Sequence, residues 1–240
     1  MMKIFDIHTH ILPGVDDGAG SMEEALQMLE CCVAGDIAAV AVTPHCNVAG
    51  LWENYKGAEL ETAFRRLCCA AEALPVQLYS GAEVRVNDRL LPLLQAGRLP
   101  TLGKGRFLLT EFPVDYGKEA FVPMLEGILK AGYVPLVAHP ERYEAVYSDP
   151  RTVGQWLDLG CHIQLTGGSL SGVFGRRVRA AAEFLLQQDM VCCIASDAHD
   201  PVRRSNYLMD AYDHLSLRYS RRYADILMWE NPLGICENGL

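Results

Sequence analysis

Short apolar runs, each the length of a buried strand, recur along the whole chain and alternate with longer segments of helical spacing. The runs are rich in Ile, Val and Leu, and they lie at residues 3–7, 38–43, 76–80, 106–110, 134–138, 162–166 and 191–196. The segments between them have helical spacing and lie at residues 22–33, 61–74, 89–97, 119–132, 152–160, 175–188 and 204–215. This alternation of strand and helix predicts a parallel sheet with crossover helices.

Seven strand-and-helix repeats fill nearly the whole chain. Such a sheet either stays open and doubly wound or closes into a barrel. Repeats of similar length along the whole chain favour the closed barrel. We predict an α/β fold, an irregular (β/α)7 barrel, in a single domain over residues 1–240, because no Pro/Gly/Ser-rich linker or charge block divides the chain. The wide gap after the first strand, from residue 16 onward, predicts an ordered loop that carries site residues. Residues 223–235 could form an extra helix that closes the mouth or rim of the barrel.

Composition narrows the class of protein. The 240 residues include 21 basic and 30 acidic side chains, a formal net charge of −9, whereas most nucleic-acid binders need a basic face. No tract is long enough and free enough of charge to cross a bilayer, and the apolar stretch before Asp6 is too short for a signal peptide. We therefore expect a folded cytoplasmic protein that neither binds nucleic acid nor inserts into a membrane.

The nine cysteines do not predict a thiol enzyme. Three adjacent pairs lie inside apolar stretches, where Cys behaves as a small hydrophobic residue, and reduced thiols are expected in the cytoplasm. No Cys-x-x-Cys pair occurs, and no Cys is followed six positions later by Arg, the spacing of thiol phosphatases. The chain also lacks the Gly-x-Ser-x-Gly and Gly-x4-Gly-Lys motifs of serine hydrolases and phosphate-binding loops.

Histidines and carboxylates follow six of the seven predicted strands. In chain order they are His8, His10, Asp16, Asp17, His45, Glu83, Glu111, His139, Asp197 and His199. Because the C-terminal strand ends of a (β/α) barrel meet on one face, these side chains should converge. Taken singly, each has an ordinary reading as a helix cap or turn residue. Together, imidazoles and carboxylates are ligands for Zn, Mn or Fe, and they exceed what one tetrahedral ion can use, so the pattern predicts two or three metal ions.

Six motifs carry a resemblance to a known family. They are DIHTHILPGVDDGA, TPH, GAE, TEFP, AHPERY and ASDAHD, in this order, within a match that spans about residues 4 to 212. In this order they resemble the polymerase-and-histidinol-phosphatase (PHP) superfamily and, more narrowly, the manganese-dependent bacterial capsule-type protein tyrosine phosphatases. The resemblance implies a distorted (β/α)7 barrel with a trinuclear metal centre, in agreement with the strand count.

The resemblance also implies a role for each site residue. His8, His10 and Asp197 would hold the first ion, and Glu83 would bridge to a second ion that Glu111 and His139 complete. Asp17, His45 and His199 would hold the third, with Asp16 the less suitable of the two adjacent acids. Arg142 and Arg204 would grip phosphate through their planar guanidinium groups, and Arg203 is the alternative to Arg204.

The implied reaction is hydrolysis of a phosphomonoester by in-line attack of a metal-bound hydroxide, with two or three divalent ions, most often Mn, while Fe and Zn stay open. His199 or a metal-bound water would donate the proton to the leaving group. The implied substrate is a phosphotyrosine protein, the tyrosine-rich tail of a bacterial tyrosine kinase that controls capsule or exopolysaccharide assembly. A homo-oligomer is compatible with this reading, and the oligomeric state stays open.

Three other readings stay open. The first is a PHP phosphatase for a small molecule such as histidinol phosphate. The second is a metal-dependent amidohydrolase, which also begins with His-x-His but usually carries a modified lysine after strand four, where this chain has Glu111. The third is a non-catalytic, metal-loaded scaffold.

Overall fold

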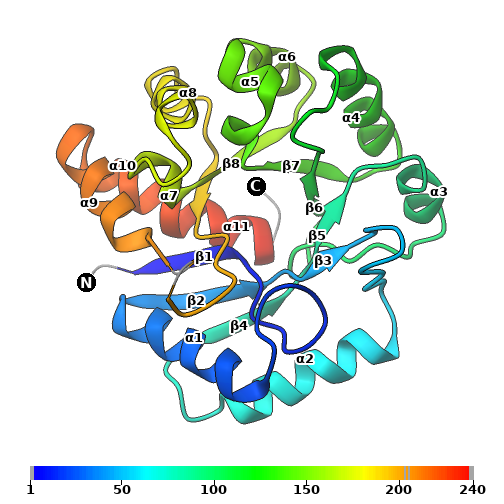
Figure 1. The fold of residues 1–240 in the computed structure, drawn as a ribbon, viewed down its shortest axis with the longest axis vertical. Helices are drawn as coiled ribbons and strands as arrows, with labels where there is room; N and C mark the ends of the chain where they lie inside the picture. Colours follow the sequence, from blue (N-terminus) through cyan, green and yellow to red (C-terminus); the bar gives the residue numbers. More distant parts are fainter. Residues whose placement is uncertain (1–2, 203, 205, 238–240) are drawn as a thin grey trace.

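Seven strand-and-helix units follow one another around a ring in the structure, a computed structural model that describes residues 3–202, 204 and 206–237 (Figure 1). The seven principal strands all lie at predicted positions. They are β1 (Ile4–Thr9), β2 (Ile37–Val42), β4 (Gln77–Ser80), β6 (Phe107–Glu111), β7 (Val134–Ala138), β8 (His162–Thr166) and β9 (Cys193–Ala195). All strand pairs in the ladders are parallel, as the alternation of strand and helix predicts.

Two of the strands are interrupted and then continue. After β2 and β4, the chain forms the short strands β3 (His45–Cys46) and β5 (Glu83–Arg85), which pair with each other. The ladder thereby divides into a β1-β2-β4 sheet and a β3-β5-β6-β7-β8-β9 sheet. Pro44 lies at the first break and has no amide hydrogen to donate to a ladder. Gly81 lies at the second, where a Cβ would come within 2.9 Å of the Leu102 side chain.

The last strand lies beside the first. The His10 amide donates to the Ala198 carbonyl at 2.9 Å, and the Asp197 amide donates to the His8 carbonyl at 3.0 Å. Asp6 strengthens the contact between the first and last strands, because its carboxylate accepts the Ser196 amide at 2.9 Å. The predicted distorted (β/α)7 barrel is confirmed, and the two interrupted strands are the visible part of its distortion.

The seven predicted helices are all present. They are α1 (Met22–Ala34), α2 (Ala58–Ala70), α3 (Leu90–Gln95), α4 (Phe121–Lys130), α6 (Thr152–Asp158), α8 (Arg176–Gln187) and α9 (Leu208–Arg218). The helix predicted over residues 119–132 begins as the 3-10 turn η1 (Lys118–Ala120) and continues as α4. Three short helical segments were not predicted: η2 (Pro140–Arg142), α5 (Glu144–Ser148) and α7 (Gly167–Leu170). They occupy the connections that leave the C-terminal ends of β7 and β8.

Helix α1 shows how the site loop is anchored. The Ser21 hydroxyl accepts the Glu24 amide at 3.2 Å, and the Glu24 carboxylate accepts the Gly20 amide at 2.9 Å. This reciprocal pair resembles a capping box and fixes where the loop after β1 ends.

The hydrophobic core has two layers. The larger lies between the strands and the surrounding helices, and the smaller fills the inside of the ring with residues such as Phe5, Ala41, Leu109 and Leu136. Small side chains are frequent in the inner layer because space inside a seven-stranded ring is limited. None of the nine cysteines forms a disulfide in the structure.

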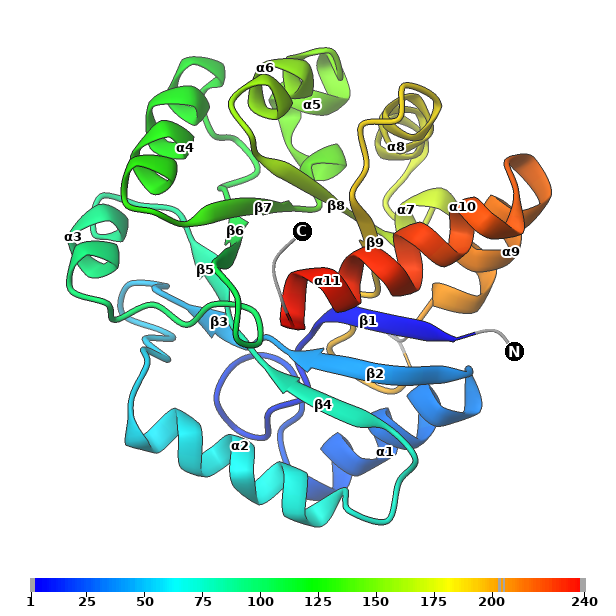
Figure 2. The same ribbon diagram turned by 180° about the vertical axis from the view of Figure 1, so that it is seen from behind.

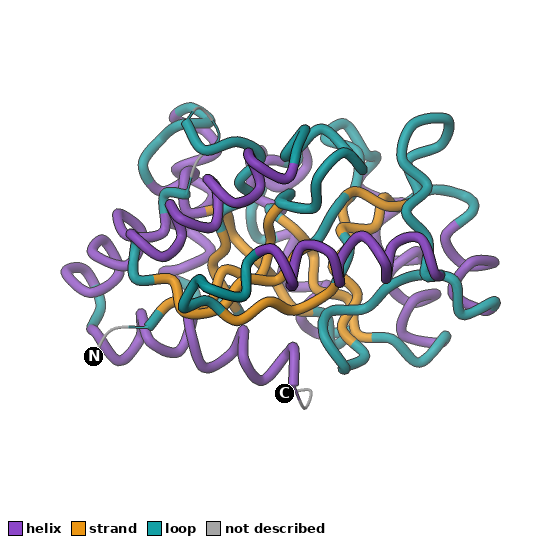
Figure 3. The backbone as a smooth tube through the Cα atoms, turned by 90° about the horizontal axis from the view of Figure 1, so that it is seen from below, coloured by secondary structure: helices purple, strands orange, loops and turns teal. Residues whose placement is uncertain are grey.

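The C-terminal segment forms one continuous helical stretch made of α10 (Arg221–Asp225), the π-helical η3 (Ile226–Glu230) and α11 (Asn231–Glu237). Ile235 and Cys236 join the inner core layer. The Lys104 amide donates to the Cys236 carbonyl at 3.0 Å, and Asn231 donates to the Cys192 carbonyl at 2.8 Å. These partners precede β6 and β9, so the predicted extra helix exists but covers the opposite end of the barrel from the mouth (Figures 2 and 3).

Within the part of the chain that the structure describes, none of the helices has the length and apolar character needed to span a membrane.

Phe5→Ala is expected to lower the free energy of unfolding by about 3–5 kcal/mol, because Phe5 is fully buried between Tyr79 and Trp229 and its loss leaves a cavity. Urea unfolding followed by circular dichroism would measure the change. The control is Leu217→Ala on the exposed end of α9, with an expected change within about 0.5 kcal/mol. A loss below about 1 kcal/mol for Phe5→Ala would contradict this account of the inner core.

Candidate metal centre

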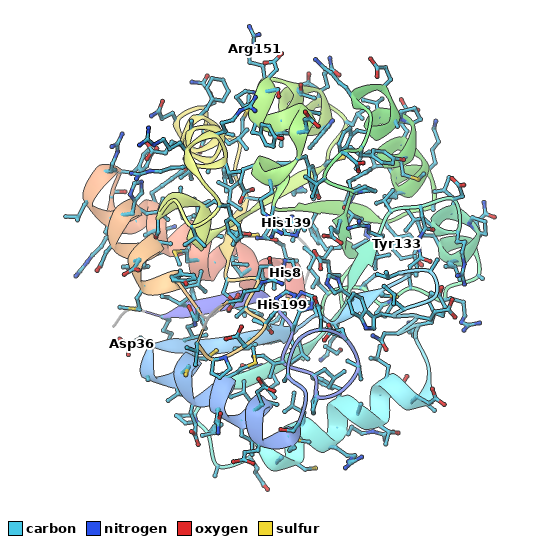
Figure 4. The ribbon with its side chains drawn as sticks, viewed as in Figure 1. His8, Asp36, Tyr133, His139, Arg151 and His199 are labelled. Carbon is cyan, nitrogen blue, oxygen red and sulfur yellow. The ribbon has the colours of Figure 1, made fainter. Side chains whose placement is uncertain are left out.

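The chemically active residues expected from the sequence meet at the C-terminal ends of the strands. Figure 4 labels His8, His139 and His199, which lie near one another at the middle of the ring, while Asp36 and Arg151 lie at its periphery. We call the following nine residues the centre: His8, His10, Asp17, His45, Glu83, Glu111, His139, Asp197 and His199. They come from the four strands β1, β3, β5 and β6 and from the loops after β1, β7 and β9.

Glu83, at the start of β5, lies in the middle of the centre and is buried. Its Oε1 is 2.9 Å from His139 Nε2 and 3.4 Å from His8 Nε2. Its Oε2 is 2.9 Å from His45 Nδ1 and 3.5 Å from His10 Nε2. One carboxylate therefore faces four imidazoles.

Four groups of side chains bring potential ligand atoms within 4.8 Å of one another. These groups are His10, Asp17, His45 and His199; His8, His10 and Asp197; His8, Glu83 and His139; and His45, Glu83 and Glu111. Together they contain all nine residues of the centre. Glu111 is grouped with His45 rather than with His139, whose Nε2 is 4.0 Å from Glu111 Oε1.

Irregular backbone turns these side chains inward. The register of β1 against β2 shifts between Asp6 and Thr9, and both Ile7 and His8 face the interior. His139 and Asp197 adopt left-handed conformations, with φ of 35° and 54°, at the ends of β7 and β9. Such conformations are costly for residues other than glycine, and they cluster at functional sites.

Two histidines are oriented by partners outside the centre. His8 Nδ1 lies 2.9 Å from Gln164 Oε1, and His10 Nδ1 lies 2.8 Å from Asp16 Oδ2. Because both partners are hydrogen-bond acceptors, Nδ1 of each ring is the donor and each Nε2 faces the centre, where the neutral form of the ring would offer its lone pair to a cation. The two Nε2 atoms are only 3.2 Å apart, an arrangement that a cation between them would stabilise.

Asp16 and Gln164 are thus positioning residues. The Asp16 carboxylate also accepts the amides of His45 at 2.9 Å and Gly18 at 3.0 Å, which uses both of its oxygens. This agrees with the expectation that Asp17 is the better ligand of the pair. Sequence reasoning missed Gln164, whose only signal was a polar residue inside the apolar run 162–166.

The loop after β1 folds back over the centre. The Ala19 amide donates to the His10 carbonyl at 2.9 Å, and a side chain at Gly18 would collide with that carbonyl. Only glycine permits this close approach. The loop then presents Asp17 Oδ1 at 3.4 Å from His45 Nε2 and 3.5 Å from His199 Nε2.

The electrostatics of the centre favour bound positive charge. Burial opposes the ionised form of Glu83 and Asp197, yet the neighbouring histidines hold the pKa of each carboxyl well below its usual value. Burial also opposes a charged His45, but contacts with Asp17 and Glu83 raise its pKa to about 9. The buried atoms Glu83 Oε2, His45 Nδ1 and His139 Nδ1 have no well-formed hydrogen bond among the described residues. Oxygen and imidazole donors with unmet electrostatic demand fit divalent ions such as Mn, Fe or Zn.

Two arginines converge beside the centre. Arg142 Nη1 and Arg204 Nη2 lie 2.7 and 3.1 Å from the same oxygen, Oδ2 of Asp197. The Arg142 guanidinium also lies over the ring of Phe174, 4.7 Å from its centroid. Arg203, the alternative to Arg204, lies outside the described residues.

An aromatic side chain that the sequence reasoning did not identify borders the same face. The ring of Trp52 stacks on His45 with a centroid separation of 5.0 Å and an interplanar angle of 10°. Nothing in the spacing of the motifs pointed to Trp52, because the loop after β3 has no regular pattern.

Comparison with known proteins identifies relatives over nearly the whole chain. The sequence model of the family described as "Capsular polysaccharide synthesis, CpsB/CapC" matches residues 4–237. Tyrosine-protein phosphatase YwqE of Bacillus subtilis is 31% identical over 211 residues, which cover 87% of this chain and 82% of that protein. Tyrosine-protein phosphatase CpsB of Streptococcus pneumoniae is 30% identical over 235 residues, which cover 95% and 96%.

A solved structure shares the fold as well. It is described among the crystal structures of YwqE from Bacillus subtilis and CpsB from Streptococcus pneumoniae, "unique metal-dependent tyrosine phosphatases". It superposes with a TM-score of 0.90 at 29% sequence identity and covers 99% of this chain and 95% of that one. The resemblance to the capsule-type phosphatases is confirmed, and the chain belongs to the CpsB/CapC family of capsular polysaccharide synthesis.

Proposed function

We propose that the chain is a metal-dependent phosphomonoester hydrolase that removes phosphate from tyrosine in a protein. The observation that carries this proposal is the convergence of nine potential metal ligands with two guanidinium groups beside one carboxylate, Asp197. Two guanidinium groups beside a site for several metal ions suit a phosphoryl group, because a phosphoryl group carries negative charge on several oxygens. The names of the relatives, tyrosine phosphatases, favour phosphotyrosine over a small phosphate ester and over a non-catalytic scaffold.

The proposed ligand sets account for two or three divalent ions, with Mn the first choice and Fe or Zn as alternatives. His8, His10 and Asp197 would hold the first ion, and Glu83 would bridge to the second, which Glu111 and His139 would complete. Asp17, His45 and His199 would hold the third. The grouping of the first three residues with one another, and of the last three with His10, supports the first and third sets. When bound, such ions lower the pKa of a coordinated water to about 7 and neutralise charge on the phosphoryl oxygens.

The residues of the chain itself bind and orient the substrate. Arg142 and Arg204 each offer planar guanidinium donors to phosphoryl oxygens. Asp197 Oδ2 accepts a hydrogen bond from each of them and so fixes their positions. The ring of Phe174 supports Arg142 from one side. A phosphate that enters between these arginines is oriented before hydrolysis begins, which lowers the entropy cost of the reaction.

His199 has two proposed roles that depend on ion occupancy. Its Nδ1 lies 3.0 Å from the Asp197 carbonyl, and its Nε2 faces Asp17. With three ions bound, Nε2 is a ligand and has no proton to give. With two ions bound, Nε2 could donate a proton to the leaving oxygen only from the charged form of the ring, and burial together with His10 lowers the pKa of His199, which favours a metal-bound water as the donor. The demand is small, because a tyrosine phenol has a pKa of about 10 and leaves more easily than an alkoxide.

The finer assignments rest on the family. We infer that the substrate is the phosphorylated tail of a bacterial tyrosine kinase involved in capsule or exopolysaccharide assembly, and that the enzyme acts in the cytoplasm. The family described for capsular polysaccharide synthesis supports this inference.

Metal removal gives the direct test of the proposed function. After a chelator has removed the metal, the rate of phosphate release from a phosphotyrosine peptide is expected to fall by at least about 100-fold. Added Mn, Fe or Zn is expected to restore this rate. Vanadate, which inhibits thiol phosphatases, should have little effect. Histidinol phosphate serves as the comparison substrate. If folded protein binds two or three ions but releases no phosphate from the peptide with any metal, the tyrosine phosphatase proposal is wrong.

Arg142→Lys and Arg204→Lys are each expected to lower kcat/KM for the peptide by about 100-fold, because Lys lacks the planar fork that binds two phosphoryl oxygens. Metal content, measured by elemental analysis, should stay unchanged. The matched control is Arg151→Lys, at the periphery in Figure 4, which should leave activity at the wild-type level. Activities within twofold of wild type for both site variants would exclude these residues as the phosphate grip.

Gln164→Leu is expected to weaken metal binding by about 10- to 100-fold, since His8 loses the acceptor that keeps its proton on Nδ1. Isothermal titration of the stripped protein with Mn would measure this affinity. Gln77→Leu, at the exposed start of β4, is the matched control. Equal affinities for wild type and Gln164→Leu would show that Gln164 has no part in orienting His8.

A further inference from the structure

Large apolar side chains are exposed on the face that carries the centre. Among the described residues, six such side chains are exposed, and Leu217 and Tyr219 lie at the end of α9, away from the strand ends. The other four lie in loops that follow β3, β6, α7 and β9. We call these four the apolar rim: Leu51, Val114, Val173 and Val202, with exposed fractions of 69%, 48%, 52% and 78%.

Two rim residues precede aromatic side chains that touch the centre or its arginines. Leu51 precedes Trp52, which stacks on His45. Val173 precedes Phe174, which supports the Arg142 guanidinium. Each of these exposed side chains is therefore held next to a group that the proposed function uses.

The other two rim residues are also fastened near the centre. Val202 lies between His199 and Arg204, and the Asp200 carboxylate accepts the amides of Val202 at 2.7 Å and Arg204 at 3.0 Å. Val114 follows Glu111 by three residues, and its carbonyl accepts the Glu144 amide at 2.9 Å. The loops that carry the rim are thus tied by hydrogen bonds to the segments that carry the site.

Single exposed apolar residues are normal on a protein surface, but the position of these four in loops on the face that carries the centre indicates an apolar partner for that face. The rim residues follow β3, β6, α7 and β9, which are spread around the ring (Figure 2), so a single small molecule bound to the centre would not cover them all. The buried position of Glu83, Asp197 and His199 requires a phosphate on a side chain that can reach inward. An extended protein segment meets both conditions.

We propose that the apolar rim binds apolar or aromatic residues on both sides of the phosphotyrosine in an extended protein segment. This inference rests on the proposed function and names a feature of its substrate. The formal charge of −9 disfavours acidic flanking residues, whereas apolar contacts attract a segment independently of charge. The rim thereby distinguishes a protein substrate from a free phosphate ester.

The test compares substrates that do and do not reach the rim. Metal-loaded wild type and a Leu51→Ser/Val173→Ser/Val202→Ser variant would be assayed on three substrates: a phosphotyrosine peptide flanked by Leu and Phe, the same peptide flanked by Gly and Ser, and p-nitrophenyl phosphate. The variant is expected to raise KM for the apolar peptide by about tenfold, with little change in kcat, because apolar area is no longer buried on binding. The other two substrates serve as internal references. Leu217→Ser is the control for an exposed apolar residue away from the site.

The possible results separate the inference from the proposed function. An unchanged KM for the apolar peptide overturns the inference alone. An equal loss on all three substrates also overturns it, since the rim would then act through the centre. A change of oligomeric state in sedimentation, with unchanged KM, would assign the rim to contact between copies of the chain. If wild type hydrolyses none of the three substrates, the proposed function fails and the inference fails with it. The single variant Val202→Ser, with an expected rise in KM of about threefold, repeats the test should the triple variant fold poorly.

Discussion

The buried carboxylate of Glu83 among four imidazoles is the constraint on which the centre depends. A carboxylate removed from water is stable only when positive charge or hydrogen bonds compensate it. Here Asp197 adds a second buried acid within reach of His8 and His10. The surrounding residues respond to this demand with raised histidine pKa values and with two arginines. Divalent ions would compensate the buried negative charge more completely, which explains how the fold tolerates several acids so close together.

Irregular backbone at a few positions brings the side chains of the centre to the mouth of the barrel. An undisturbed strand alternates its side chains between two faces, so it can place only every second residue inside the barrel. The breaks after β2 and β4 let His45 and Glu83 start new short strands at the mouth. The left-handed residues His139 and Asp197 turn the chain sharply at the ends of β7 and β9. The C-terminal helix closes the other end, so water and substrate approach from the site face.

The sequence predicted the strands, the helices and the convergence of the centre, because parallel strands in a barrel must end on one face. Local pattern alone could not predict the break at Gly81, where a Cβ would come within 2.9 Å of Leu102, a residue distant in the chain. Gln164 was missed because its role exists only once β8 lies opposite His8. Which end of the barrel residues 223–235 cover could not be predicted for the same reason. Their apolar side chains join the inner core, which exists only when the ring has formed.

Asp197 links the two halves of the proposed chemistry. Its Oδ1 lies 3.5 Å from His8 Nε2 and 3.4 Å from His10 Nε2, on the side where the first ion is proposed. Its Oδ2 holds both Arg142 and Arg204. A cation held by His8, His10 and Oδ1 would therefore share one carboxylate with the two arginines, so Asp197 would set where the phosphoryl group lies relative to that cation. A change at Asp197 would disturb the cation site and the phosphate-binding arginines together, because no other described residue contacts both sets of side chains in this way.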